Sequence, residues 1–197
     1  MRRGMLGLGA ATLPFGWWLA AGGLGMTGHM AGHMLAVAVA APLIAAGLSG
    51  TRADPAARWP RLVTPMGAML AELVIVWSWH LPAAREWAAM SRGAMVLEQA
   101  MYLAAGFALW SAAFAAGNRA SGIGALLLTS MHMTLLGALI GLAPRPLYQD
   151  MTMHHGLDPL ADQQLGGVVM LMIGAASYMA GGLALLAKLL MGREASA

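Results

Sequence analysis

The sequence predicts an all-α protein, a polytopic bundle of transmembrane helices. Of its 197 residues, 59% are hydrophobic and only 10% are charged, and the mean hydropathy is +0.68. Soluble domains carry about a quarter charged residues, so a soluble globule, a nucleic-acid binder and a disordered chain are all poor interpretations. The apolar runs are continuous rather than alternating, which excludes the strands of a membrane barrel and leaves helices.

Six stretches are long and apolar enough to cross a bilayer, because a span needs about 20 apolar residues at about 1.5 Å of rise each. No connector between them suggests a second domain, so residues 1–197 are predicted to form a single transmembrane domain. The glycine pairs Gly28/Gly32 and Gly137/Gly141 predict close helix packing. The six spans cover about residues 4–24, 26–48, 62–80, 94–116, 121–142 and 164–190.

Charges and prolines delimit these stretches. The first follows Arg2 and Arg3, and this start also resembles a signal sequence; its length and the lack of a clean cleavage site predict that it is retained. A connector with Pro55 separates the second stretch from the third, which ends just before Pro82. The longest connector, residues 143–163, precedes the last stretch.

Basic residues predict the orientation. With six spans both termini share one side, and eight of the 11 Lys and Arg residues fall on that side. Cytoplasmic segments carry the excess of Lys and Arg, so both termini are predicted to be cytoplasmic. The eight are Arg2, Arg3, Arg52, Arg58, Arg61, Arg119, Lys188 and Arg193, and the opposite side has Arg85, Arg92 and Arg145.

Polar side chains inside a bilayer are costly and are therefore functional candidates. His29 and His33 are four residues apart near the outer start of the second stretch, so they share a helical face. His80 ends the third stretch on the same side, Glu98 lies about one turn into the fourth, and His132 lies at mid-depth in the fifth. All six His are thus expected in the outer half of the membrane or outside it.

Imidazole together with thioether favours copper, because thioether selects Cu(I) and imidazole binds both copper states as well as zinc. The chain has 18 Met and no Cys, which excludes disulfides and thiolate metal sites. We therefore expect a copper site, with Cu(I) favoured, in which carboxylates orient the imidazoles. The candidate metal-site residues are His29, His33, His80, His132, Met30, Met34, Met133, Glu98 and Asp162.

Each of these candidate residues also has an interpretation that involves no metal. His29 could be solvated at the headgroups, His80 could cap a helix, and His132 could hydrogen-bond across helices. Methionines fill cores more often than they bind metals. Glu72 is either protonated and hydrogen-bonded or paired with a residue that the sequence does not identify. A loop cluster is expected to be solvated, with metal capture as the lesser alternative; it comprises Met151, Met153, His154 and His155.

Four sequence blocks follow one another between about residues 28 and 170. They are GHMAGHM at 28–34 with AAPL at 40–43, WSWHLP at 77–82, MHMTLLGA at 131–138 with APRPLY at 143–148, and DPLADQQLGG at 158–167. Together they resemble the membrane CtaG family of cytochrome c oxidase assembly proteins. Two features depart from that family: many members have a His where this chain reads LEQA at 97–100, and members often have seven spans.

The resemblance implies a multi-pass protein of the bacterial inner (plasma) membrane that assembles a haem–copper oxidase and handles its copper. The residues carried over as metal-site candidates are His29, His33, His80 and His132, with Asp162 in support. The implied partners are membrane lipid, an oxidase subunit and a copper-donating protein, with no nucleic acid.

Three functions remain open at this stage. The expected one is an assembly factor that binds copper at the outer face and delivers it. The alternatives are a structural membrane partner without metal and a b-type haem protein with axial imidazoles. We do not expect an enzyme, because the chain has neither a phosphate-binding loop nor a Ser in a nucleophile elbow.

Overall fold

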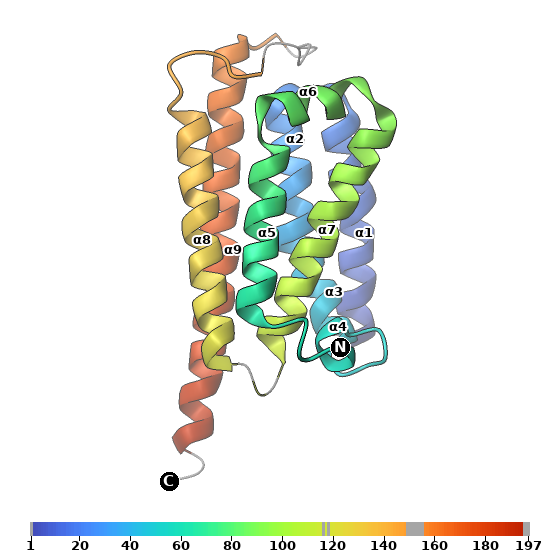
Figure 1. Ribbon diagram of the computed structural model, residues 1–197, viewed down its shortest axis with the longest axis vertical. Coiled ribbons are helices and arrows are strands. Elements are labelled where there is room, and N and C mark those ends of the chain that lie inside the picture. The colour runs from blue at the N-terminus through green and yellow to red at the C-terminus, as the bar shows by residue number, and fades with distance from the viewer. Residues whose placement is uncertain (1, 116, 118, 149–155, 195–197) are drawn as a thin grey trace.

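The computed structural model describes residues 2–115, 117, 119–148 and 156–194, and in these ranges it contains helices and no strand (Figure 1). The helices are α1 (Arg2–Ala21), α2 (Gly25–Met34), the π-helix η1 (Leu35–Ala40), α3 (Ala41–Leu48), α4 (Pro55–Arg58), α5 (Pro65–Trp79), α6 (Pro82–Met90), α7 (Arg92–Phe114), α8 (Arg119–Gly141) and α9 (Pro159–Glu194). The all-α prediction is confirmed for the described residues.

Each of the six predicted stretches coincides with a long helix, the second being α2, η1 and α3 in continuous succession. By length and apolar composition, three described helices can cross a membrane: Gly25–Leu48, Arg119–Gly141 and Pro159–Met191. A fourth span results if α5 and α6, bent by 72° at their junction, count as one. The six-span arrangement and the cytoplasmic termini stay predictions.

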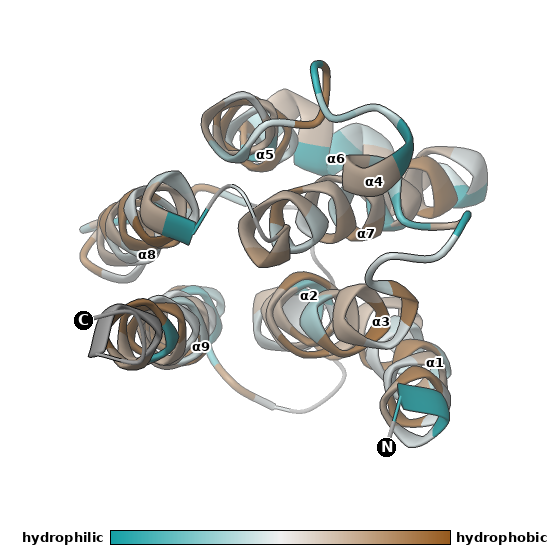
Figure 2. Ribbon diagram, turned by 90° about the horizontal axis from the view of Figure 1, so that it is seen from below, coloured by the Kyte–Doolittle hydropathy of each residue, from teal (hydrophilic) through white to brown (hydrophobic). Residues whose placement is uncertain are grey.

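The bundle has two distinct ends. The start of α1, α4 and the ends of α7 and α9 lie at one end, and α6 with the end of α8 and the start of α9 lies at the other (Figure 1). We call the second the α6 end. Viewed along the helices, α8 and α9 form a pair on one side, α1 lies on the opposite side, and α2, α3, α5 and α7 lie between them (Figure 2).

Helix starts follow from local sequence. Proline occupies the first position of α4, α5, α6 and α9, where its missing N–H breaks no helical bond. Hydroxyl or carboxylate oxygens of the preceding residues accept amides of the first turn: Thr64 for α5 and Ser91 for α7, both at 3.3 Å, and Asp158 for α9 at 3.1 Å. The starts of α4 and α5 lie at the end of the bundle with α4, and those of α6, α7 and α9 lie at the α6 end (Figure 1).

Pro42 explains the wide turn of η1. Proline lacks an N–H, and its ring clashes with the carbonyl four residues earlier, here that of Ala38. The helix widens, and Ala38 O accepts the Ser177 hydroxyl of α9 at 2.6 Å instead. Val37 O accepts Trp110 Nε1 of α7 at 3.0 Å. Carbonyls that a membrane interior cannot solvate are thereby satisfied, and α7 and α9 are joined to this helix.

The bundle buries several polar side chains within its apolar core and exposes large apolar side chains on its outside. On α5, Leu70 and Val74 are exposed while Glu72 between them is fully buried. On α8, Leu135 is exposed while His132 is buried. Soluble bundles show the reverse distribution, and an apolar exterior of this extent suits hydrocarbon. The protein is a membrane protein.

Candidate functional site

Three buried histidines meet at the α6 end. His29 and His33 come from successive turns of α2, and His80 follows the last residue of α5. The ring centroids of His29 and His80 are 5.6 Å apart, those of His33 and His80 are 5.3 Å apart, and those of His29 and His33 are 6.3 Å apart. Three of the four histidines predicted to share a metal site thus lie together; we call these three the histidine cluster.

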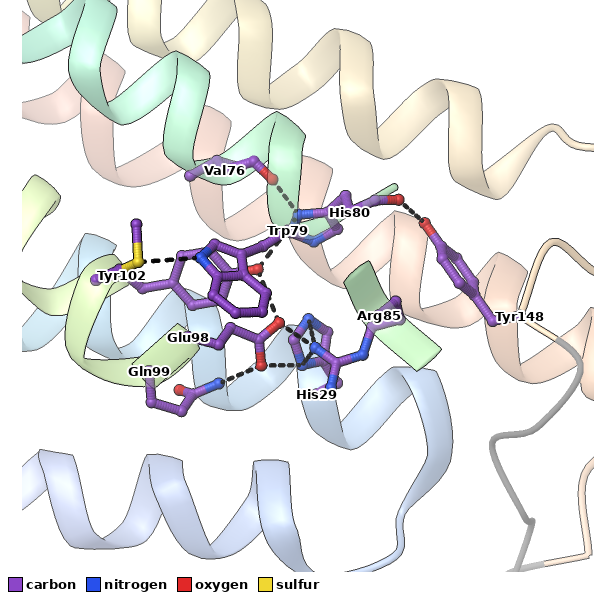
Figure 3. Close-up of polar contacts among 10 residues, drawn as sticks. His29, Val76, Trp79, His80, Arg85, Glu98, Gln99, Tyr102 and Tyr148 are labelled. Atoms are coloured by element: carbon purple, nitrogen blue, oxygen red, sulfur yellow. Dashed lines mark hydrogen bonds and ion pairs between the residues drawn. The ribbon is translucent and has the colours of Figure 1, made fainter. Parts of the chain in front are cut away.

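Free nitrogens remain on two of the rings. His80 Nδ1 lies 2.6 Å from Val76 O, and because a carbonyl can only accept, Nδ1 carries the proton (Figure 3). The Nε2 lone pair of the neutral ring is then available, and it has no hydrogen-bond partner among the described residues. Neither nitrogen of His33 has one there. Buried nitrogens without partners are costly and call for an explanation.

An ion pair lies against the third ring. Helix α6 brings Arg85 into the interior, where Nη1 pairs with Glu98 Oε1 of α7 (Figure 3). The same Nη1 lies 3.1 and 3.3 Å from Nδ1 and Nε2 of His29. Arg85 is 4% exposed and Glu98 is 0% exposed. The guanidinium therefore separates an imidazole and a carboxylate that could both bind a cation.

Neighbours on α7 complete the surroundings of Glu98. Tyr102, four residues later and so on the same face, donates its hydroxyl to Glu98 Oε1 at 3.2 Å. Its ring meets His33 edge-on, with centroids 4.1 Å apart. Gln99 Nε2 donates to Glu98 Oε2 at 3.4 Å, and His29 Nδ1 lies 3.9 Å from that oxygen. The carboxylate is held close to the histidine cluster.

The long connector also reaches this site. Tyr148 donates its hydroxyl to His80 O at 2.8 Å, which closes the C-terminal end of α5 (Figure 3). Burial raises the pKa of Tyr148 to about 12, although the charge of Arg85 opposes the rise. The phenol stays protonated at neutral pH and keeps donating to the backbone beside His80.

The remaining candidates occupy other places. His132 is buried on α8 and makes no ring contact with the histidine cluster in the described structure. The thioethers of Met30 and Met34 on α2 and of Met133 on α8 are completely buried. Met34 and Met133 both pack against Gly174 of α9, where a Cβ would lie 3.4 Å from Met34 Cε and 3.2 Å from Met133 Cβ. His132 and these thioethers extend the set of soft donors toward the membrane interior.

Asp162 joins two helix starts. Its carboxylate oxygens accept the amides of Met26 at 2.6 Å and Thr27 at 3.1 Å, at the N-terminus of α2, where the helix dipole favours a negative charge. Asp162 thus fixes α2, which carries His29 and His33, against α9. The loop cluster Met151, Met153, His154 and His155 lies outside the described residues.

The sequence interpretation missed three residues of this site. Arg85 was used only to assign a side of the membrane, and neither Tyr102 nor Tyr148 was a candidate. Tyr102 could have been found, because it lies four residues after Glu98 on one helical face. Arg85 and Tyr148 reach the site from connectors whose paths the sequence pattern does not define.

As the side chains stand, no three His, Asp or Glu residues in the described part of the chain are arranged to hold a metal ion. The donors are nevertheless adjacent. Ligands at about 2 Å from one ion place imidazole centres about 5–6 Å apart, and the cluster shows 5.3–6.3 Å. Rotation of rings, with displacement of Arg85 from His29, is what metal binding would require.

Comparison with known protein families identifies the family of this chain. The family model for the cytochrome c oxidase caa3 assembly factor (Caa3_CtaG) matches residues 4–191. The chain belongs to this family. The resemblance seen in the four sequence blocks is therefore confirmed, and the chain is a cytochrome c oxidase assembly factor of the Caa3_CtaG type. No curated protein and no solved structure is similar enough to count as a match.

Proposed function

We propose that this Caa3_CtaG protein binds copper as Cu(I) in the histidine cluster and delivers it to a subunit of a haem–copper oxidase. The observation that carries the proposal is the meeting of three buried imidazoles from two helices with unpartnered nitrogens on His33 and His80. Burying such atoms without partners costs free energy. A metal ion bound by both rings would give a partner to one nitrogen of His33 and to Nε2 of His80.

The environment of His80 fits a metal ligand. Metal-binding imidazoles commonly donate one ring N–H to a backbone carbonyl, which fixes the tautomer and directs the other nitrogen at the ion. Here Val76 O accepts from Nδ1, leaving Nε2 as the donor atom for the metal. Neutral imidazoles with buried Met30 and Met34 on the same helix favour Cu(I), because thioethers select the softer ion.

The location of the cluster suits transfer. It lies at the α6 end, which the distribution of Arg and Lys predicts to face away from the cytoplasm of a plasma-membrane protein. A copper-donating protein would load the site from that side, and an oxidase subunit would take the ion from it. No chemical transformation is needed, so the proposed role is that of a non-enzymatic chaperone.

Copper content tests this proposal. The purified protein is incubated with Cu(I) without oxygen, and bound copper is measured for wild type, His33→Ala and His80→Ala. We expect roughly one ion per wild-type chain and almost none in either variant. Ser111→Ala is the control, since it truncates a buried polar side chain near the end of α7 that is remote from Glu98; it should retain its copper. Equal copper content in all four proteins would overturn the proposal.

Oxidase activity in cells supplies the second measurement. His33→Ala and His80→Ala should lower the activity of the copper-containing oxidase, and excess copper in the medium should restore part of it. Full activity with copper-free, folded variants would instead support a structural partner without metal.

A further inference from the structure

A positive charge already lies in the histidine cluster. The guanidinium of Arg85 is bounded by His29 on one side and Glu98 on the other (Figure 3). Arginine is protonated at any physiological pH, so this charge is permanent. Its Nε has no hydrogen-bond partner among the described residues, whereas Nη1 is shared between the ring and the carboxylate.

The fold holds this charge in place. Helix α6 turns by 72° from α5 and carries Arg85 inward together with Ala88, which is also buried. On the outer side of the same helix, Trp87 stacks on Trp79 of α5, with centroids 5.6 Å apart and planes 11° apart. Arg85 therefore cannot extend into solvent unless α6 moves.

The charges of the cluster decide which ion it accepts. When the imidazoles are neutral, the charges of Arg85 and Glu98 sum to zero. A bound metal ion therefore adds its full charge to a buried site. Repulsion between the ion and Arg85 grows in proportion to the charge of the ion and is strong where water is excluded. A divalent ion suffers twice the penalty of a monovalent one.

We propose that Arg85 is a specificity-determining residue, a resident cation that keeps divalent metals out of the histidine cluster and lets a monovalent ion load. This inference rests on the proposed copper site and explains how that site avoids Zn(II), which imidazoles otherwise bind well. The plain alternative is an Arg85–Glu98 pair that only fastens α6 to α7. Metal selectivity distinguishes the two, because a structural fastener has no reason to affect Zn(II) more than Cu(I).

The test compares the dissociation constants of Cu(I) and Zn(II) for wild type and Arg85→Met, using chelator competition. Removing the charge should tighten Cu(I) binding about tenfold and Zn(II) binding about a hundredfold, because the electrostatic free energy doubles with the ionic charge. Arg92→Met is the matched control: it removes an exposed arginine at the start of α7 and should change neither constant.

A double variant separates charge from packing. Arg85→Met with Glu98→Gln restores a neutral cluster, so most of the gain in Zn(II) affinity should disappear. The double variant also replaces Arg85→Met in the test if that single variant folds poorly, because the double variant leaves no buried carboxylate unpaired. Retention of the full gain by the double variant would overturn the inference.

The outcomes separate this inference from the proposed function. Cu(I) binding by wild type that depends on His33, with both constants unchanged in Arg85→Met, overturns the inference alone. Binding of both ions by Arg85→Met and of neither by wild type overturns both, because a wild-type site that Arg85 also closes to Cu(I) does not select a monovalent ion. If no variant binds either ion, both are wrong.

Discussion

At the residue scale, Glu72 shows how a buried carboxyl in a membrane helix finds its partner. It lies in the middle of α5, where an unpaired charge is most costly, and its Oε1 accepts the Tyr178 hydroxyl of α9 at 2.7 Å. Thr129 of α8 faces the same carboxyl. The Tyr178 ring stacks on Trp110, with centroids 5.4 Å apart. One side chain thus joins α5 to α9 through a contact between residues 106 positions apart.

Tyr178→Phe tests this link. The substitution keeps the stacked ring and removes the donor, which leaves Glu72 Oε1 unsatisfied at a cost of about 1–3 kcal/mol. Thermal unfolding in detergent should show a lower midpoint, while copper binding stays unchanged. Tyr148→Phe is the comparison, because Tyr148 is itself partly exposed in a connector and its hydroxyl bonds the backbone carbonyl of His80; it should cost less. A Tyr178→Phe midpoint equal to that of wild type would show that the bond contributes nothing net.

At the element scale, the pairing of α8 with α9 depends on three glycines, two on α8 and one on α9. A Cβ on Gly167 would lie 2.6 Å from Gly137 O and from Gly141 N, and a Cβ on Gly137 would lie 2.9 Å from Gly167 O. All three neighbours are backbone atoms that cannot rotate away. The close packing predicted from Gly137 and Gly141 is confirmed, and the partner helix also supplies a glycine.

Gly167→Ala should therefore separate α8 from α9. Overpacking of this kind costs about 1–3 kcal/mol, which exceeds the gain in helix propensity of roughly 1 kcal/mol. Chemical unfolding in mixed micelles would measure the loss. Gly182→Ala on the same helix is the control, since its Cβ would meet Leu127 at 3.5 Å, an ordinary contact; it should be neutral or stabilising. Similar values for both variants would contradict the backbone argument.

Two other elements show the limits of the sequence pattern. Pro82 was recognised as the end of a span, but α6, which begins at this residue, was assigned to a connector because its nine residues are too few to cross a bilayer. The π-helix η1 was not predicted either, because Pro42 signals a disturbed turn without specifying its width. Both depend on what packs against them, and both shape the surroundings of the histidine cluster.

At the scale of the whole molecule, the sequence predicted the long helices and half of the site. Apolar length places six helices without any tertiary information, and a spacing of four residues puts His29 and His33 on one face. The approach of His80 followed from assigning it the same side of the membrane. The lack of a ring contact between His132 and the cluster, and the entry of Arg85, depend on helix rotation and on the path of α6, which no periodicity encodes.

The orientation of the bundle decides whether the copper site can serve an oxidase subunit from outside. The start of α1, the end of α9 and α4 lie at one end of the structure, as an even number of spans requires (Figure 1). Arg and Lys predict that this end is cytoplasmic. The α6 end, with the histidine cluster, would then face the periplasmic side.

Single cysteines test that orientation, since the natural chain has none. Ala53→Cys adds a thiol before α4, and Ala83→Cys adds one in α6; both positions are exposed. A maleimide that cannot cross membranes should label Ala83→Cys in intact cells with a permeable outer membrane, and Ala53→Cys only after lysis. The cysteine-free parent controls for background labelling. The reverse pattern would place the cluster on the cytoplasmic side, where it could accept copper only from cytoplasmic donors, and delivery from the outer face would be wrong.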